Sequence, residues 1–147
     1  MENGALISIQ HLVKQFPIGG RKFTALNDIN LTFTTGEFTG LVGPSGSGKT
    51  TLLNIIGALD NPTGGSAVVM GKDTGKLSHS QSARLRNEYL GFIFQTYNLL
   101  PVYNVFENVE FPLLLLGMSA TDRRNAVLQA LEWVGLTDKV NSRPAQL

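Results

Sequence analysis

A stretch of nine residues, GPSGSGKTT at positions 43–51, constrains the fold of this chain more than any other segment. It matches a pattern of glycine, any four residues, glycine, lysine and then serine or threonine. The matching residues are Gly43, Gly48, Lys49 and Thr50. An apolar run at 38–42 leads into the stretch, and a second apolar run follows it at 51–59. This order predicts a strand, a glycine-rich loop and a helix, which is the setting in which the pattern binds phosphate groups.

Each residue type in this loop has a physical role. The glycines allow the backbone N–H groups to turn inward as an anion-binding nest, because no Cβ atom is in the way. The helix that follows directs the positive end of its dipole at the same place. The Lys49 ammonium can reach the β- and γ-phosphates of a nucleotide, and the Thr50 hydroxyl can coordinate Mg²⁺. Small-molecule kinases, GTPases, helicases and transport ATPases all use such a loop, so the loop alone predicts the ligand and not the activity.

Composition argues against several other classes of protein. The chain has 147 residues, 42% of them apolar, which suits one compact domain with a core. A net charge of +1 argues against a general nucleic-acid-binding protein, which would need a basic stripe. Because the chain has no cysteine, disulfides and thiolate metal sites are excluded. Charged residues make up only 16%, which favours a partner that covers part of the surface.

Five segments have the patterns of β-strands. They are residues 7–10, 29–34, 38–42, 66–70 and 90–94. In the first two, apolar and polar residues alternate, as is typical of half-buried strands. The other three are short apolar runs, which favour buried strands.

Three segments have the patterns of helices. Residues 51–59 are apolar on nearly all sides, which predicts a helix buried against a sheet. Ser78 and Gln81 have the spacing of a capping box, which predicts that a second helix begins there. The third helix has one apolar face, with Thr121 as the predicted cap and Gly135 just past the end. That face consists of Ala126, Val127, Ala130, Leu131 and Val134. Strands alternating with helices predict an α/β fold with an added antiparallel part at the N-terminus.

Four segments together resemble the nucleotide-binding subunit of an ABC transporter, of the subgroup for lipoprotein release and macrolide-type export. They are the loop with its second threonine, LLNIIGALDNPTGG at 52–65, LGFIFQTYNLLP at 90–101 and ENVEFPLLLLG at 107–117. The resemblance extends from about Leu6 to Leu147. It implies the α/β P-loop NTPase core of an ABC ATPase, and ATP hydrolysis that powers transport in the intact protein.

The resemblance also implies roles for individual residues. Phe16, beside a short hairpin at 17–24, matches an aromatic residue that stacks on adenine; otherwise it would be a core phenylalanine. Gln95 matches a glutamine that contacts Mg²⁺ and the attacking water, whereas the residues alone predict only a loop glutamine. The predicted nucleotide-binding residues are Phe16, Gly43, Pro44, Ser45, Gly46, Ser47, Gly48, Lys49, Thr50 and Thr51. Lys49 and Gln95 are the predicted catalytic residues, and Thr50 and Gln95 the predicted Mg²⁺ ligands.

Partners are implied as well. In this family the region after Gln95 faces transmembrane permease subunits, and two ATP-binding subunits form a homodimer that encloses ATP. The apolar segment 97–116 would then form a groove for a short helix of the permease, or else the core of a helical subdomain. The side chains in question are Leu99, Leu100, Val102, Tyr103 and Phe106. The expected location is cytoplasmic, peripheral on the inner face of the cell membrane, with no nucleic acid as partner.

The C-terminal end bears on activity. The family continues from a segment like RPAQL, here residues 143–147, into a signature loop of serine, two glycines and glutamine. The catalytic glutamate, a second carboxylate for Mg²⁺ and a switch histidine come later still. We therefore expect residues 1–147 to be the truncated N-terminal part of one ABC transporter ATP-binding domain, which binds nucleotide without turnover on its own.

Two other functions fit the loop. A small-molecule kinase would need arginines that converge near a lid, and the candidates are Arg84, Arg86, Arg123 and Arg124. The chain could also be a non-catalytic nucleotide-binding or assembly module. Equilibrium binding of ATP, measured beside turnover, separates such a module from a transport ATPase.

Overall fold

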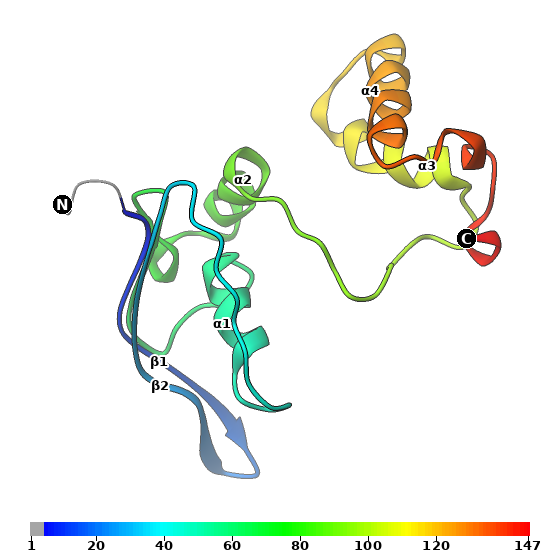
Figure 1. The fold of residues 1–147 in the computed structure, drawn as a ribbon. Coiled ribbons are helices and arrows are strands. Elements are labelled where there is room, and N and C mark those ends of the chain that lie inside the picture. The colour runs from blue at the N-terminus through cyan, green and yellow to red at the C-terminus, as the bar shows by residue number, and fades with distance from the viewer. Residues whose placement is uncertain (1–4) are drawn as a thin grey trace. The chain divides into compact units, whose positions relative to one another are not determined.

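The computed structural model describes residues 5–147, which form two units. The first unit ends at Phe92, and the second consists of residues 93–147. A β-sheet and helices α1 and α2 make up the first unit, whereas the second contains helices α3 and α4 (Figure 1). The phosphate-loop pattern therefore belongs to the first unit.

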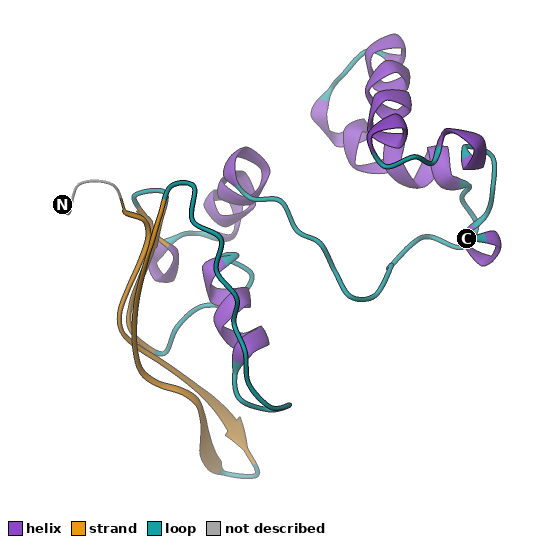
Figure 2. Cartoon of the chain, viewed as in Figure 1, coloured by secondary structure: helices purple, strands orange, loops and turns teal. Residues whose placement is uncertain are grey.

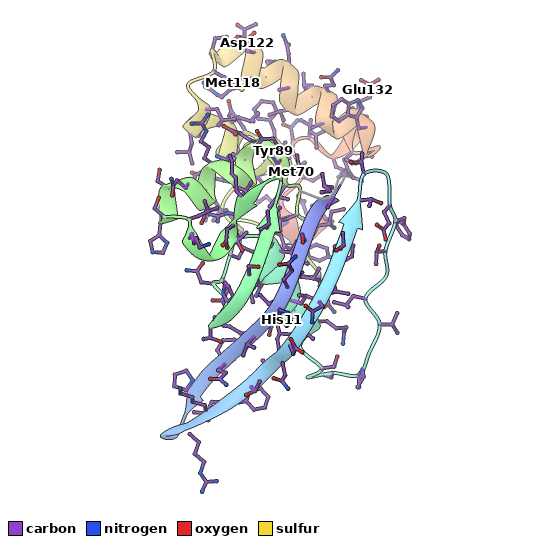
Figure 3. The ribbon with its side chains drawn as sticks, turned by 90° about the vertical axis from the view of Figure 1, so that its left-hand side faces the viewer. His11, Met70, Tyr89, Met118, Asp122 and Glu132 are labelled. Atoms are coloured by element: carbon purple, nitrogen blue, oxygen red, sulfur yellow. The ribbon has the colours of Figure 1, made fainter. Side chains whose placement is uncertain are left out.

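The sheet of the first unit has four antiparallel strands in the order β2-β1-β3-β4. The strands are β1 (Ala5–Ile18), β2 (Arg21–Thr34), β3 (Gly64–Val69) and β4 (Lys72–Asp73). β1 and β2 form a long hairpin that reverses at Gly19 and Gly20, and Figure 3 shows this sheet with His11 about halfway along β1. Three predicted strands are thus confirmed, those at 7–10, 29–34 and 66–70. The predicted N-terminal antiparallel part and its hairpin are confirmed with them.

Helix α1 (Lys49–Ile56) covers one face of this sheet (Figure 1). Leu52 and Ile55 are buried, and they pack with apolar side chains of the strands because they lie three residues apart on one side of the helix. The buried cluster consists of Ile9, Leu12, Leu26, Leu52, Ile55 and Ala67. Ala58 adopts a left-handed φ of 50°, so the helix ends earlier than the predicted residue 59.

Helix α2 (His79–Tyr89) begins with the predicted capping box. The backbone N–H of Gln81 donates to the Ser78 hydroxyl at 3.3 Å, and the Ser78 N–H donates to Gln81 Oε1 at 2.8 Å. Arg86 donates from Nη1 to the carbonyl oxygen of Ala58 at 2.6 Å. Because Ala58 lies just past the end of α1, this bond fastens the two helices together.

Two predicted strands, at 38–42 and 90–94, are wrong. Both segments are irregular in the structure and are drawn as loops in Figure 2. Phe38, Val42 and Ile93 are 101%, 94% and 103% exposed, so these apolar side chains do not enter a core. An apolar run favours a strand, but a strand forms only where a second strand accepts its hydrogen bonds. Within residues 5–147 no strand pairs with either segment.

The second unit is helical. Helices α3 (Val105–Glu110) and α4 (Ala120–Trp133) pack through a cluster of Val105, Val127 and Leu131. The unit also contains short 3₁₀ turns at Phe111–Leu116, Thr137–Lys139 and Pro144–Gln146. Arg123 of α4 donates from Nε to Glu110 Oε1 at 3.0 Å, so an ion pair supports the apolar contact.

Two predictions for α4 are wrong in detail. Ser119 caps the helix instead of Thr121, because its hydroxyl accepts the Asp122 N–H at 3.2 Å. Val134 is 66% exposed, since the helix ends at Trp133 before that side chain can turn inward. Gly135 follows with a φ of 69°, as predicted. No helix among residues 5–147 combines the length and the apolar character that crossing a membrane requires.

Candidate phosphate-binding site

The loop at 43–51 is pressed against strand β2. Gly48 has a φ of 88°, and a Cβ atom at this position would lie 2.7 Å from the Ala25 carbonyl oxygen and 3.0 Å from Leu26 Cδ2. No side chain fits there, because the backbone of β2 cannot give way as a flexible side chain could. Gly46 also has a positive φ, of 80°, but a Cβ atom on it would meet nothing within 4 Å. Close packing of loop and strand therefore demands glycine at 48, and conformation alone favours it at 46.

The N-terminus of α1 is open to an anion. Its cap is Gly48, which offers no side-chain acceptor, and the first turn contains no acidic residue. The first N–H groups of a helix have no partner within the helix, and the dipole makes this end positive. Most helices satisfy these groups with a capping side chain such as Ser78 of α2. The start of α1 therefore fits a phosphate group as its acceptor.

Lys49 places the charge of this site inside the loop. Its Nζ donates to the carbonyl oxygens of Gly43 at 2.7 Å and Pro44 at 2.8 Å, and to the Ser47 hydroxyl at 3.3 Å. The Ser47 N–H in turn donates to the Pro44 carbonyl at 3.3 Å. All three acceptors of the ammonium are neutral. Phosphate oxygens are stronger acceptors, so they can displace these contacts at little conformational cost.

The hydroxyls of Thr50 and Thr51 complete the predicted set. Both residues lie in the first turn of α1, Thr50 exposed and Thr51 half-buried. Among residues 5–147 there is no group of three or more His, Asp or Glu side chains that could hold a metal ion. A Mg²⁺ ion bound through the Thr50 hydroxyl would take further ligands from the nucleotide and from water, as Mg²⁺ commonly does. The structure thus brings all the predicted residues of 43–51 together in one loop and one helical turn.

Phe16 lies near the hairpin end of β1, opposite Phe23 of β2. Its side chain is half-buried and does not belong to the apolar cluster under α1. The ammonium of Lys14 lies over its ring, 5.0 Å from the ring centroid. Lys14 was not among the predicted site residues, although a lysine two positions after the buried Leu12 on a strand is a signal that could have identified it.

Gln95 belongs to the second unit, whereas Phe16 and the loop belong to the first. It is exposed and lies in the irregular segment that follows the wrongly predicted strand at 90–94. The structure therefore places Phe16 and the loop in one unit and Gln95 in the other.

The apolar segment 97–116 lies partly in the core of the second unit and partly at an open cavity. Phe106 packs against the core of the second unit, and the Tyr103 ring contacts that of Phe111 with centroids 6.1 Å apart. Leu99 instead lines an apolar cavity of about 590 Å³. The other lining residues are Tyr97, Asn98, Leu136, Pro144 and Leu147. Part of the segment thus builds the helical core, and part forms an open cavity.

The four arginines proposed for a kinase lid all contact groups close to them within their own unit. Arg84 pairs with Glu88 on the surface of α2, and Arg86 donates to the Ala58 carbonyl. In the second unit, the other two contact Glu110 and the Phe106 ring. Because each of these arginines already has a local partner, none of them is held ready for a second substrate, and the kinase alternative loses its support.

Comparison with known proteins gives a consistent result. The family model described as ABC transporter matches residues 26–147. The macrolide export ATP-binding/permease protein MacB of Burkholderia pseudomallei is 43% identical over 144 residues, covering 98% of this chain and 22% of MacB. MacB of Acinetobacter baylyi is 45% identical over 147 residues, covering 100% and 22%. The chain thus spans about a fifth of the length of these curated relatives.

A solved structure has the same fold. The dimeric ATP-binding cassette MJ0796, in a post-hydrolysis state bound to ADP and Pi, superposes with a TM-score of 0.86 at 37% identity. The match covers 96% of this chain and 62% of the cassette. The predicted P-loop NTPase fold of the ABC ATPase type is thereby confirmed.

Proposed function

Because the chain belongs to the ABC transporter family, we propose that it binds MgATP through the loop at 43–51 and that ATP hydrolysis by the intact protein powers transport. Residues 1–147 would form the N-terminal part of one ATP-binding domain. The observation that carries this proposal is the position of the Lys49 ammonium, 2.7 Å from the Gly43 carbonyl oxygen beside an uncapped helix end. A full positive charge and free N–H groups then face the same ligand.

Each site residue has a role in this proposal. The loop N–H groups and Lys49 bind the β- and γ-phosphates, and Phe16 stacks on the adenine ring. The Thr50 hydroxyl and the Gln95 amide oxygen hold Mg²⁺, which when bound neutralises part of the phosphate charge. Gln95 also orients the water that attacks the γ-phosphate, because a neutral amide can hold water without adding charge.

The partners in this proposal are a second ATP-binding domain and a transmembrane permease. Support for the first comes from the solved cassette, which is dimeric. The second is supported by the relatives, whose name joins an ATP-binding part to a permease. We place the permease contact at the region after Gln95, where the apolar cavity beside Leu99 lies. Such a domain would work at the cytoplasmic face of the cell membrane.

Titration with nucleotides that differ in their phosphates tests the proposal. The chain of 147 residues is titrated with MgATP, ADP and AMP in an isothermal calorimeter. We expect MgATP and ADP to bind and AMP to bind at least about tenfold more weakly, because AMP lacks the β-phosphate that the loop and Lys49 address. Equal affinity for AMP and MgATP, or no binding of any of the three, would contradict the proposal.

A further inference from the structure

A buried lysine joins the strand that carries Phe16 to the turn that follows α1. Lys14 is 8% exposed, and its Nζ donates to Asp60 Oδ1 at 2.6 Å and to the Asn61 carbonyl oxygen at 2.7 Å. A buried ammonium requires such partners, because it has lost its water. Neither of these two acceptors belongs to the phosphate loop.

The turn is also bound to β1 on both sides of Lys14. Thr63 donates to the Val13 carbonyl oxygen from its backbone N–H at 2.9 Å and from its hydroxyl at 3.0 Å. The Gln15 N–H donates to the same hydroxyl at 2.9 Å. The turn at 60–63 is therefore held along the strand by a continuous set of hydrogen bonds, with the Lys14 ammonium among them.

Lys14 contacts Phe16 as well. Its Nζ lies over the ring, 5.0 Å from the centroid, within the range at which the negative face of an aromatic ring attracts a cation. The two residues are two positions apart on β1, so their side chains lie on the same side of the strand. An aromatic ring has two faces. The ammonium lies over one of them, so a planar ligand would stack on the other.

Helix α1 connects the contacts of Lys14 to the phosphate loop. The helix begins at Lys49 and ends at Ile56, and the Asp60 N–H donates to the Asn54 carbonyl oxygen at 3.3 Å. Asp60 is thus tied to the helix by its backbone and to Lys14 by its carboxylate. The ion pair between Lys14 and Asp60 therefore links the strand that carries Phe16 to the helix that begins at the loop.

We propose that Lys14 is a positioning residue for nucleotide binding: held by Asp60 and Asn61, it orients the Phe16 ring for a base whose phosphates lie in the loop. A nucleotide contacts the protein at both ends, so a base platform held in place before binding loses less freedom when the ligand arrives. This inference rests on the proposed function, and specifically on Phe16 as the residue that stacks on the base.

Two probes separate the base platform from the phosphate loop. MgATP uses both, whereas inorganic tripolyphosphate with Mg²⁺ uses only the loop. Affinities for both are measured by calorimetry on the 147-residue chain and its variants. In Lys14→Met we expect MgATP to bind about 5- to 10-fold more weakly, the lower part of the range for loss of a stacked base, while tripolyphosphate affinity stays within about twofold.

Conservative and control variants complete the design. Lys14→Arg keeps a cation and its donors, and should restore most of the MgATP affinity. Asp60→Asn keeps an acceptor oxygen without the charge, and should show the same base-dependent loss of affinity in weaker form. It takes the place of Lys14→Met in the test if that variant folds poorly. Lys76→Met removes a lysine whose side chain is 83% exposed and paired with Asp73, and should leave both affinities unchanged. In a Phe16→Ala background, Lys14→Met should have no further effect on MgATP.

The outcomes separate this inference from the proposed function. If Lys14→Met leaves the affinities for MgATP and for tripolyphosphate unchanged, the inference is overturned and the proposed function is not. A parallel loss of MgATP and tripolyphosphate also overturns it, because it shows that Lys14 supports the whole unit and not the base platform. If the wild-type chain binds neither MgATP nor tripolyphosphate, the proposed function and the inference are overturned together.

Discussion

Gly48 lies against Ala25 so closely that a Cβ atom on the glycine would be 2.7 Å from the alanine carbonyl oxygen. This contact fixes the phosphate loop onto the hairpin of β1 and β2. It also sets the start of α1, because Gly48 is the helix cap and its carbonyl accepts the Leu52 N–H at 2.9 Å. Gly48 therefore both packs against β2 and begins the helix whose N-terminus fits a phosphate group.

Gly48→Ala should destabilise the first unit and weaken phosphate binding. Strain from the positive φ contributes about 1–2 kcal/mol, and the clash with the β2 backbone adds to it. Gly46→Ala is the matched control, since it has the same strain without the clash. Thermal unfolding should show a midpoint several degrees lower for Gly48→Ala than for Gly46→Ala. Equal midpoints would mean that the close contact with Ala25 does not constrain the loop.

Lys49→Ala should abolish most MgATP binding. It removes the one full positive charge that the loop contains, and the N–H groups that remain carry only partial charges. We expect an affinity lower by roughly 10- to 100-fold, which corresponds to hydrogen bonds with a charged donor. Isothermal titration of both forms provides the measurement, with Lys76→Ala as a control for the loss of an exposed lysine. Near-equal affinities in Lys49→Ala and wild type would exclude the loop as the phosphate site.

Phe16→Ala should weaken the binding of ATP and ADP to the same extent, by roughly 1–3 kcal/mol. Stacking depends on the ring face and is indifferent to the γ-phosphate. Phe16→Tyr keeps that face and should be nearly neutral, whereas Phe23→Ala alters the exposed ring opposite Phe16 and serves as a control. Competition titrations with both nucleotides measure the effect. A loss confined to ATP, or no loss, would show that Phe16 does not contact the base.

Residues 1–147 should show no ATPase activity above that of Lys49→Ala. Phosphoryl transfer depends on positioned charges around the γ-phosphate and on a group that orients the attacking water. In the part of the first unit that the structure describes, all five carboxylates accept hydrogen bonds from residues outside the loop. They are Asp28, Glu37, Asp60, Asp73 and Glu88.

A phosphate-release assay on the purified chain checks this expectation. Both forms are compared at the MgATP concentration that saturates the wild type, and bound nucleotide is measured in the same samples. Turnover by the wild type that disappears in Lys49→Ala would reveal a catalytic base among these residues, and the view of the chain as binding without hydrolysis would then be wrong.

Two signals confined to neighbouring residues predicted the starts of helices α1 and α2 correctly. The spacing of Gly43, Gly48, Lys49 and Thr50 predicted the loop and the helix after it, because each residue acts on backbone a few positions away. The capping box of Ser78 at the start of α2 is equally local. Alternating apolar and polar residues predicted parts of β1 and β2, at 7–10 and 29–34, because alternation places the apolar side chains on one face of a strand.

Tertiary structure decided the features that depend on distant partners. The apolar segment at 38–42 has the composition of a strand, yet it pairs with no strand among residues 5–147 and stays irregular. Lys14 and Asp60 are 46 positions apart, and neither residue type predicts the other. Local sequence determines which conformations a segment prefers, but hydrogen bonds between strands and a buried ion pair exist only when folding brings both partners together.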